Sequence, residues 1–261
     1  MKKTHFAIVT GASSGMGVEF ARQLAQRGYN LLIVSNEERI HEVAKQISEL
    51  GNSELEVIPL VLDLGKQSSA RELYEYAHAH EIEVEVLVNN AGVYHDRDIL
   101  DDSEGFTSLI INLHMYTPAM LCYLFGQDMK ARRKGYILNV CSVTDKMAAQ
   151  RLGTYGGTKA FLSHFTRALH IELRQYGVYV TNVRPGAVDT GLYNIKPVFT
   201  KIGKCLGIIV SPQTLVRRAL RALFRGRAKT TVPTVFWRAL TFLITLIPTW
   251  QLRLIRRFGW F

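Results

Sequence analysis

The sequence predicts an α/β fold in which a parallel sheet is covered by helices on both faces. Short apolar runs of strand length alternate with longer segments of helical character along most of the 261 residues,. The first run, Phe6–Val9, leads directly into a glycine-rich turn and then into a helix. Strands that alternate with helices form parallel sheets with right-handed crossovers, and this is the basis of the prediction.

The glycine-rich turn, Thr10–Gly17, has the spacing G-x-x-x-G-x-G. Its glycines, Gly11, Gly15 and Gly17, allow a tight turn, a close approach of the backbone to a pyrophosphate, and close packing of the next helix, Val18–Arg27,. A glycine triplet alone is weak evidence. Between a strand and a helix, it indicates a dinucleotide site.

The later elements continue the alternation without a linker or a repeat, so residues 1–233 are expected to form one domain. The expected strands are Leu31–Val34, Leu55–Leu62, Val86–Val88, Tyr136–Val140, Val178–Val183 and Thr231–Pro233. The expected helices are Glu37–Leu50, Ser68–Ala79 with Ser68 as its N-cap, Phe106–Lys130, Thr154–Tyr176, and one that Ser211 and Pro212 open,.

Composition and cysteine usage point to an intracellular globular protein. Hydrophobic residues make up 48% and charged residues 21% of the chain,. The three cysteines are odd in number and lack metal-ligand spacing, which predicts a reducing compartment without a disulfide framework,. The first apolar run is too short for the core of a signal peptide. We therefore expect a cytoplasmic location and no metal site.

The net charge of +10 is unevenly distributed. Residues 1–189 hold 19 basic and 22 acidic side chains, a balance of −3, whereas residues 190–261 hold 13 basic side chains and no acid. Such an asymmetry suggests an anionic partner for the C-terminal part. The aromatic residues there cluster in apolar runs instead of alternating with arginines, so we expect no nucleic-acid binding,.

The candidate catalytic residues are Tyr155, Lys159 and Ser142. Tyr155 and Lys159 lie four residues apart, hence on one face of a helix, where an ammonium lowers the phenol pKa from its usual value of about 10,. Ser142 follows a buried strand, at the sheet edge where such folds bind ligands,. Taken alone, these residues are more typical of a solvated surface pair and a turn serine than of a catalytic site. The glycine-rich turn favours the catalytic interpretation.

Over residues 4–233 the sequence resembles the short-chain dehydrogenases/reductases. Several motifs in the right order carry the resemblance: Thr10–Gly17, Asp63, Asn89–Gly92, Asn112, Ser142, Tyr155 with Lys159, and Pro185-Gly186 with Thr190. The resemblance implies a doubly wound, seven-stranded Rossmann fold that uses NAD or NADP. It also implies a dimer or tetramer in which the two long helices, about 106–130 and 154–176, pair between subunits.

The resemblance also implies residue roles. Tyr155 would be the acid–base, and Lys159 would lower its pKa and bind the nicotinamide ribose. Ser142 would hold the substrate oxygen, and Asn112 would anchor a water that links the lysine to solvent. Asp63 would hold the adenine amino group. The full set of cofactor-binding residues would be Gly11, Ser13, Ser14, Gly15, Met16, Gly17, Asn36, Asp63, Leu64, Asn90, Ala91, Gly92, Tyr155, Lys159, Pro185, Gly186, Val188 and Thr190. His114, His164 and His170 are interpreted as structural or surface residues.

The sequence departs from the family pattern after the second strand. Many members carry there an arginine for a 2′-phosphate or an aspartate for a ribose 2′-hydroxyl. Here Asn36 stands at or near that position, Glu37 and Glu38 would repel a phosphate, and Arg39 would attract it. These charges leave the choice between NAD and NADP open.

The C-terminal part is apolar as well as basic. Residues 187–210, where the family carries a loop over the substrate, are rich in apolar side chains and favour a lipophilic substrate. Residues 234–261 exceed the family core, and their uncharged run of 14 residues, Ala239–Leu252, is shorter than the roughly 20 residues of a membrane span,. Two interpretations stay open: a helix peripheral to the inner face of a membrane, or packing on protein.

The predicted function is NAD(P)-dependent hydride transfer between the nicotinamide and a ketone or secondary alcohol. A lipophilic substrate of steroid-like, long-chain 3-keto or sphingoid type is the nearest analogy. The alternative is a non-catalytic nucleotide-binding protein at a membrane surface. Because Ser142, Tyr155 and Lys159 are all present, the sequence favours the enzyme.

Overall fold

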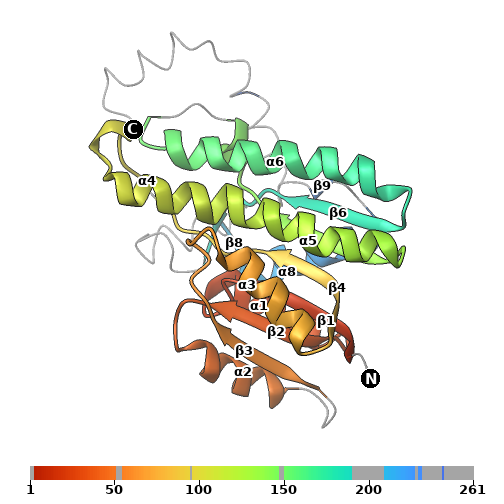
Figure 1. Ribbon diagram of the computed structural model, residues 1–261. Helices are drawn as coiled ribbons and strands as arrows, with labels where there is room; N and C mark the ends of the chain where they lie inside the picture. Colours follow the sequence, from red (N-terminus) through yellow and green to blue (C-terminus); the bar gives the residue numbers. More distant parts are fainter. Residues whose placement is uncertain are drawn as a thin grey trace.

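The computed structural model describes residues 3–50, 55–94, 96–146, 150–189, 209–226, 229–230 and 243. One parallel sheet forms the centre, with strand order β3-β2-β1-β4-β5-β6-β9. The strand order reverses between β1 and β4, which is the point where such sheets bind ligands (Figure 1),. The α/β prediction with a doubly wound parallel sheet is confirmed.

The strands are short and, except in β3, most of their residues are buried, as in parallel strands covered on both faces,. Their bounds are β1 Lys3–Thr10, β2 Asn30–Ser35, β3 Val57–Val61, β4 Ile82–Asn89, β5 Gly135–Val140, β6 Val178–Val183 and the edge strand β9 Lys229–Thr230. A separate two-stranded sheet joins β7 (Ala187–Val188) to β8 (Ile209–Val210).

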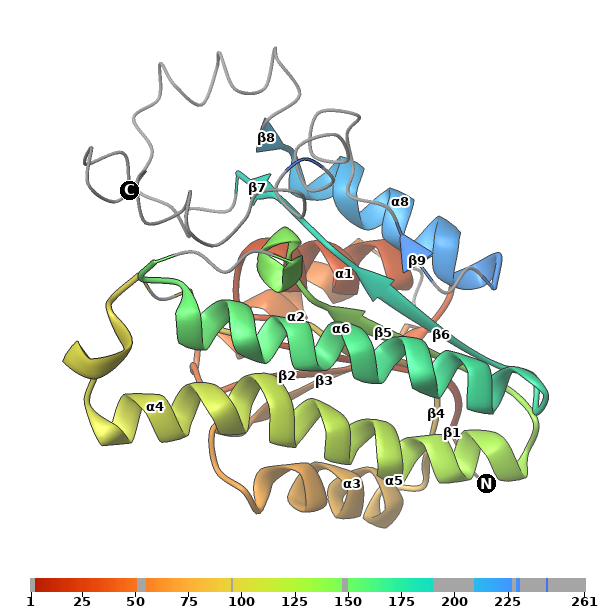
Figure 2. The same cartoon turned by 90° about the horizontal axis from the view of Figure 1, so that it is seen from above.

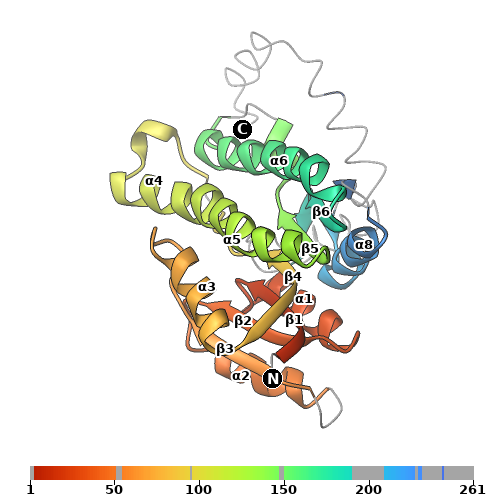
Figure 3. The same ribbon diagram turned by 45° about the vertical axis from the view of Figure 1, so that its right-hand side comes forward.

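Helices cover both faces of the sheet (Figures 2 and 3). One face carries α1 (Gly15–Ala25), α2 (Ile40–Ser48) and α8 (Pro212–Phe224), whose side chains pack in one core cluster. The other face carries α3 (Ser69–Ala79), α5 (Thr117–Ala131) and, beside α5, α6 (Gly153–Arg174). Two apolar cores therefore hold the strand ends in fixed positions.

The predicted long helix 106–130 exists, but a change of winding interrupts it. It begins as α4 (Glu104–Ile111), passes through a π-helical segment η2 (Asn112–Tyr116) and continues as α5. The stretch Glu104–Ala131 is long and apolar enough to cross a membrane, with a mean hydropathy of 1.3, yet half of its most apolar window is buried inside the domain. It is thus accounted for as a core helix.

Two helix starts test the capping predictions. The prediction that Ser68 caps α3 is wrong: its side chain makes no cap, and the neighbouring Ser69 hydroxyl donates to the Lys66 carbonyl instead. The prediction for α8 is confirmed, because the Ser211 hydroxyl accepts from the Thr214 N–H at 3.3 Å, with proline in the first turn.

Some predicted elements lie outside the described residues. These are the final strand at 231–233, nearly all of the extension 234–261, and the loop 190–208.

Candidate active site

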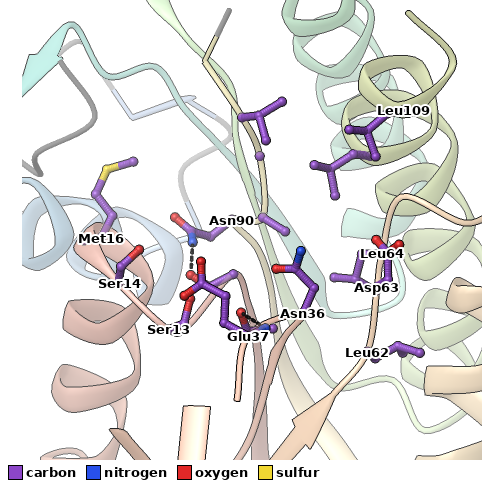
Figure 4. Close-up of a pocket in the computed structure, with 17 residues that line it drawn as sticks. Ser13, Ser14, Met16, Asn36, Glu37, Leu62, Asp63, Leu64, Asn90 and Leu109 are labelled. Atoms are coloured by element: carbon purple, nitrogen blue, oxygen red, sulfur yellow. Dashed lines mark hydrogen bonds between the residues drawn. The ribbon is translucent and has the colours of Figure 1, made fainter. Parts of the chain in front are cut away.

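A cavity of about 450 Å³ opens at the carboxyl ends of β1, β2 and β4 (Figure 4). Asn36 and Glu37 project into it from the end of β2, and Asp63 faces it from the end of β3. Its walls contain most of the predicted cofactor residues, namely Gly11, Ser13, Ser14, Gly15, Met16, Asn36, Asp63, Leu64, Asn90, Ala91 and Gly92. The predicted cofactor residues of the N-terminal half, except Gly17, therefore come together in one cavity.

The shape of the glycine-rich turn depends on its glycines. Gly15 has φ +55°, a conformation that strains any residue with a Cβ, and it begins the 11-residue helix α1,. The free N–H groups of a helix start attract anions. Gly17 does not line the cavity, and a Cβ there would lie 2.0 Å from the Gly11 carbonyl oxygen. Gly17 thus supports the turn by close packing.

The turn is tied to the loop that follows β4. The Thr10 hydroxyl accepts from the N–H groups of Asn90 and Ala91 at 2.9 and 3.0 Å. The Asn90 amide donates in return to the carbonyls of Thr10 and Gly11 at 2.9 and 3.1 Å. Asn90 therefore holds the loop at the same time as it lines the cavity. Sequence reasoning placed Thr10 in the motif without giving it this role.

Three of the four predicted catalytic residues, Ser142, Tyr155 and Lys159, border a second, adjoining cavity of about 60 Å³, and Asn112 does not line it. Ser142 comes from the end of β5, and Tyr155 and Lys159 come from the first turns of α6. Met16, Asn90 and Gly92 line both cavities, so one elongated ligand could occupy both. The second cavity is also lined by the predicted cofactor residues Pro185, Gly186 and Val188. Thr190 lies outside the described residues.

Lys159 is buried, with 4% of its surface exposed. Burial lowers its pKa to about 8, because a desolvated ammonium is costly,. Its Nζ donates to the Val140 carbonyl at 3.1 Å and lies 5.8 Å from the centre of the Tyr155 ring. The ammonium therefore sits beside the phenol, as the spacing of the pair predicts.

Ser142 is held between two strand ends. The N–H groups of Cys141 and Val143, on either side of it, donate to the carbonyls of Val183 and Pro185 at 2.7 and 3.0 Å. A buried ion pair between Arg184 and Asp145 adds a second connection between the same segments. The serine and the loop that would face the nicotinamide are thus fixed relative to each other.

Asn112 and His114 lie on the π-helical segment. Asn112 starts the segment, and its carbonyl accepts from the Thr117 N–H five residues on. His114, interpreted from sequence as structural or surface, is buried beside Tyr155, with ring centres 5.7 Å apart. No sequence signal near His114 indicates this neighbourhood, because the residues it contacts are distant in the chain.

These features define a class of protein: a Rossmann-fold oxidoreductase with a tyrosine–lysine pair beside its nucleotide cavity. Residues 5–196 match the family model of the short chain dehydrogenases. The chain belongs to this family, whose cofactor is NAD or NADP.

Curated relatives fall into two groups by name. A very-long-chain 3-oxoacyl-CoA reductase of Anas platyrhynchos is 33% identical over 223 residues, which are 82% of this chain and 67% of the relative. A hydroxysteroid dehydrogenase-like protein 1 of Gallus gallus is 31% identical over 75% of this chain and 59% of its own length. An inactive hydroxysteroid dehydrogenase-like protein 1 of Homo sapiens is 30% identical over 94% of this chain and 73% of the relative. This chain is thus shorter than these relatives.

Solved structures give the same fold. A short-chain dehydrogenase from Sphingobium yanoikuyae in complex with NADPH matches with a TM-score of 0.77 and 26% identity, over 90% of this chain and 91% of that one. A 7beta-hydroxysteroid dehydrogenase matches with a TM-score of 0.80 at 21% identity, over 92% and 91% of the two chains, which shows the fold alone.

Proposed function

We propose that this protein catalyses NAD(P)-dependent interconversion of a ketone and a secondary alcohol. The observation that carries the proposal is the joint placement of Ser142, Tyr155 and Lys159 on a cavity that adjoins the nucleotide cavity and shares lining residues with it. A merely structural tyrosine and lysine would have no reason to meet a strand-end serine there.

The chain's own residues account for the proton. In reduction, the Tyr155 hydroxyl gives its proton to the carbonyl oxygen, and Ser142 donates a hydrogen bond to the same oxygen. Lys159 stabilises the phenolate that remains. A bound nicotinamide would supply the hydride to the carbonyl carbon, and oxidation of the alcohol is the reverse of these steps.

The experiment is a panel of ketones and alcohols assayed with NAD(H) and NADP(H) by nicotinamide absorbance. Y155F is the control, since it removes the transferable proton but little volume. We expect turnover of at least one substrate and a loss of at least about 100-fold in kcat in Y155F, with cofactor Kd nearly unchanged. Y155F turning over at the wild-type rate would refute the assignment of Tyr155.

A lipophilic substrate is the best supported class. The names of the curated relatives refer to long-chain acyl and steroid chemistry. Near the catalytic cavity, the ring of Tyr94 meets that of Tyr155 edge-on at 5.5 Å. The short helix η1 (Ile99–Asp101) carries the exposed side chains Ile99 and Leu100, and Ile99 approaches Gly153 at the start of α6. These apolar groups suit a hydrocarbon chain or ring system.

NAD is proposed as the preferred cofactor. Within the described part of the chain, the nucleotide cavity is lined by two carboxylates, Glu37 and Asp63, and by no lysine or arginine. A 2′-phosphate near Glu37 would be repelled, whereas a ribose hydroxyl could donate to it. Arg39, which left the question open in the sequence, does not line this cavity.

A non-catalytic nucleotide-binding protein is the second candidate. The relatives named inactive at 30% identity favour it. The complete Ser142, Tyr155 and Lys159 set favours the enzyme. Tight NAD(H) binding without turnover of any ketone or alcohol in the panel would support the second candidate.

Two associations are proposed for the whole protein, which we expect in the cytoplasm. The first is a homo-oligomer through α5 and α6, which expose Tyr123, Phe161 and Ile171. The second is peripheral contact with an anionic membrane surface. It is supported by Arg217, Arg221 and Arg225 on the exposed side of α8 and by the acid-free sequence that follows,. No nucleic-acid partner is proposed.

Liposome binding at low salt tests the membrane contact, with a version ending at Pro233 as comparison. We expect the full chain to sediment with anionic vesicles and the shortened, still active version to lose most of this binding. Aggregation or a changed oligomeric state of the shortened version would instead show that residues 234–261 pack on protein.

A further inference from the structure

His114 occupies an unusual place for a histidine outside the predicted site. It lies on the π-helical segment η2, is 1% exposed, and is enclosed between the loop after β4 and the first turns of α6. A Cβ on Gly92 would lie 2.9 Å from its Nε2 and 3.6 Å from the Lys159 Nζ. The loop after β4, which carries predicted cofactor-binding residues, therefore passes directly against the side chains of His114 and Lys159.

The hydrogen bonds of His114 have a fixed direction. The Val93 N–H donates to Nε2 at 3.0 Å, so this nitrogen must be unprotonated,. The Thr158 hydroxyl donates to the Tyr155 carbonyl at 2.8 Å and lies 3.1 Å from the His114 Nδ1. Because the hydroxyl proton is already used, Nδ1 carries the proton and donates to the hydroxyl oxygen. The result is a continuous series of hydrogen bonds from the Val93 N–H through His114 and Thr158 to the Tyr155 carbonyl.

The surroundings keep the imidazole neutral. From α6 it faces the Lys159 ammonium and the edge of the Tyr155 ring, whereas the loop after β4 presents backbone and Gly92. Burial, and secondarily the charge of Lys159, hold the pKa of His114 well below its usual value,. A protonated ring would also place two N–H groups against each other at Val93. Its ability to accept from Val93 thus depends on staying neutral.

We propose that His114 is a positioning residue that couples the cofactor-binding loop to the catalytic turn of α6. One end of its ring holds the loop that carries Asn90 and Gly92 in the cavity walls. The other end, through Thr158, holds the backbone of Tyr155. Binding of a dinucleotide to the loop and placement of the phenol are thereby linked through one side chain.

The kinetic consequences rest on the proposed oxidoreductase function, but two readouts do not. The first is nitrogen NMR of the histidine rings in the full protein. We expect one ring, absent in H114Q, with a protonated Nδ1, an unprotonated Nε2, and no titration in the pH range where an ordinary histidine titrates. A ring assigned to His114 that titrates in this range, or has the opposite tautomer, would overturn the proposal.

The second readout is NADH binding, measured by nicotinamide fluorescence in a set of variants. H114L removes the hydrogen bonds of His114 to both Val93 and Thr158. H114Q keeps an acceptor that can reach the Val93 N–H. T158V removes only the hydrogen-bonded link to Tyr155. Loss of one hydrogen bond corresponds to about a fivefold change, so we expect the NADH Kd to rise at least about fivefold in H114L and to recover in H114Q. T158V should keep the wild-type Kd.

H170L is the matched control. His170 is also a buried histidine, on the same helix α6 as Thr158, and its Nδ1 lies 2.8 Å from the Val180 carbonyl, remote from both cavities. We expect H170L to lower thermal stability without changing the NADH Kd. If H114L and H170L lower stability equally and neither changes the Kd, His114 is an ordinary core residue.

A third measurement is the kcat of these variants with any ketone or alcohol from the panel that the wild type turns over. T158V should lower kcat at least about fivefold with an unchanged NADH Kd, since only the support of the Tyr155 turn is lost. An unchanged kcat in T158V would overturn the coupling. Absence of turnover in the wild type would refute the oxidoreductase function and leave the tautomer and Kd results to decide the proposal.

Discussion

At the residue scale, the buried ammonium of Lys159 is a costly group. Lowering its pKa from 10.5 to about 8 corresponds to roughly 3 kcal/mol against the charged form in the folded protein,. One hydrogen bond, to the Val140 carbonyl, offsets part of this cost,. A fold under selection for stability alone would replace the lysine, and its presence beside Tyr155 is consistent with a functional requirement.

The cost of Lys159 predicts a pH-dependent stability. Its folded pKa lies below its unfolded pKa, so the unfolded chain binds the extra proton between about pH 8 and 10.5,. The penalty is full below pH 8 and disappears as pH rises to 10.5. K159M should therefore be more stable than the wild type by about 1–2 kcal/mol at pH 7 and lose this advantage near pH 10. Urea unfolding of both proteins at the two pH values measures this difference in the free energy of unfolding. A difference that does not change with pH would contradict the prediction.

Cofactor choice is also decided at single residues. E37R replaces the carboxylate that lines the cavity by a cation that can pair with a 2′-phosphate,. The ratio of NADP to NAD affinity should rise at least about tenfold, because each 1.4 kcal/mol of changed interaction gives a factor of ten. E38R makes the same charge change at an exposed neighbour that does not line the cavity, and it should leave the ratio nearly unchanged. Equal shifts in both variants would show a general charge effect.

What the sequence reveals of the site depends on how local each relation is. Tyr155 and Lys159 are one helical turn apart, and the structure places them together beside Ser142 as their spacing predicts. His114 contacts residues 21 and 44 positions away, Val93 and Thr158, so no local pattern could reveal it. All of these residues lie around one site, but only those that are close in the chain, such as Tyr155 and Lys159, leave a sequence motif.

At the scale of elements, the glycine-rich turn was predicted from local sequence, whereas the π-helical segment within the long helix was not. The turn was predictable because its glycines are needed for backbone reasons at fixed spacing. The π-helical segment Asn112–Tyr116 was not predicted, although Pro118, just after it, lacks the N–H that a regular helix uses and so marks an irregularity within the long helix,. Such segments insert one extra residue into a helix and are frequent at functional sites. Here it brings His114 inward.

The turn gives a prediction about cofactor binding. G15V places a branched side chain at φ +55° and toward the space of the pyrophosphate, so the NAD Kd should rise at least about tenfold while the protein stays folded,. G105A is the control, since it also adds a side chain to a helical glycine, in α4, where a Cβ meets open space. Its Kd should equal that of the wild type. A folded G15V with an unchanged Kd would refute the phosphate-binding role of the turn.

The whole molecule combines a nearly neutral N-terminal part with a strongly basic C-terminal part. The first 189 residues carry a balance of −3 and the remaining 72 a balance of +13. The parallel sheet with helices on both faces followed from the alternation of apolar runs, whereas the order of its strands is known only from the structure. What residues 234–261 contact did not follow from their sequence, because an apolar and basic segment suits both a lipid surface and a protein surface. The extension stays a prediction.

Assembly gives the last prediction. α5 and α6 lie side by side and leave apolar side chains in solvent, Tyr123 at 58% and Ile171 at 76% exposure. Burying such groups between two subunits stabilises a dimer, and a carboxylate in their place would have to be desolvated. We expect the wild type to be a dimer or tetramer by light scattering, and I171E to dissociate at least about tenfold more readily. L50E is the matched control, because Leu50 is 56% exposed just after α2, on the opposite face of the sheet. A monomeric wild type, or equal dissociation of I171E and L50E, would rule out this helix face as the interface.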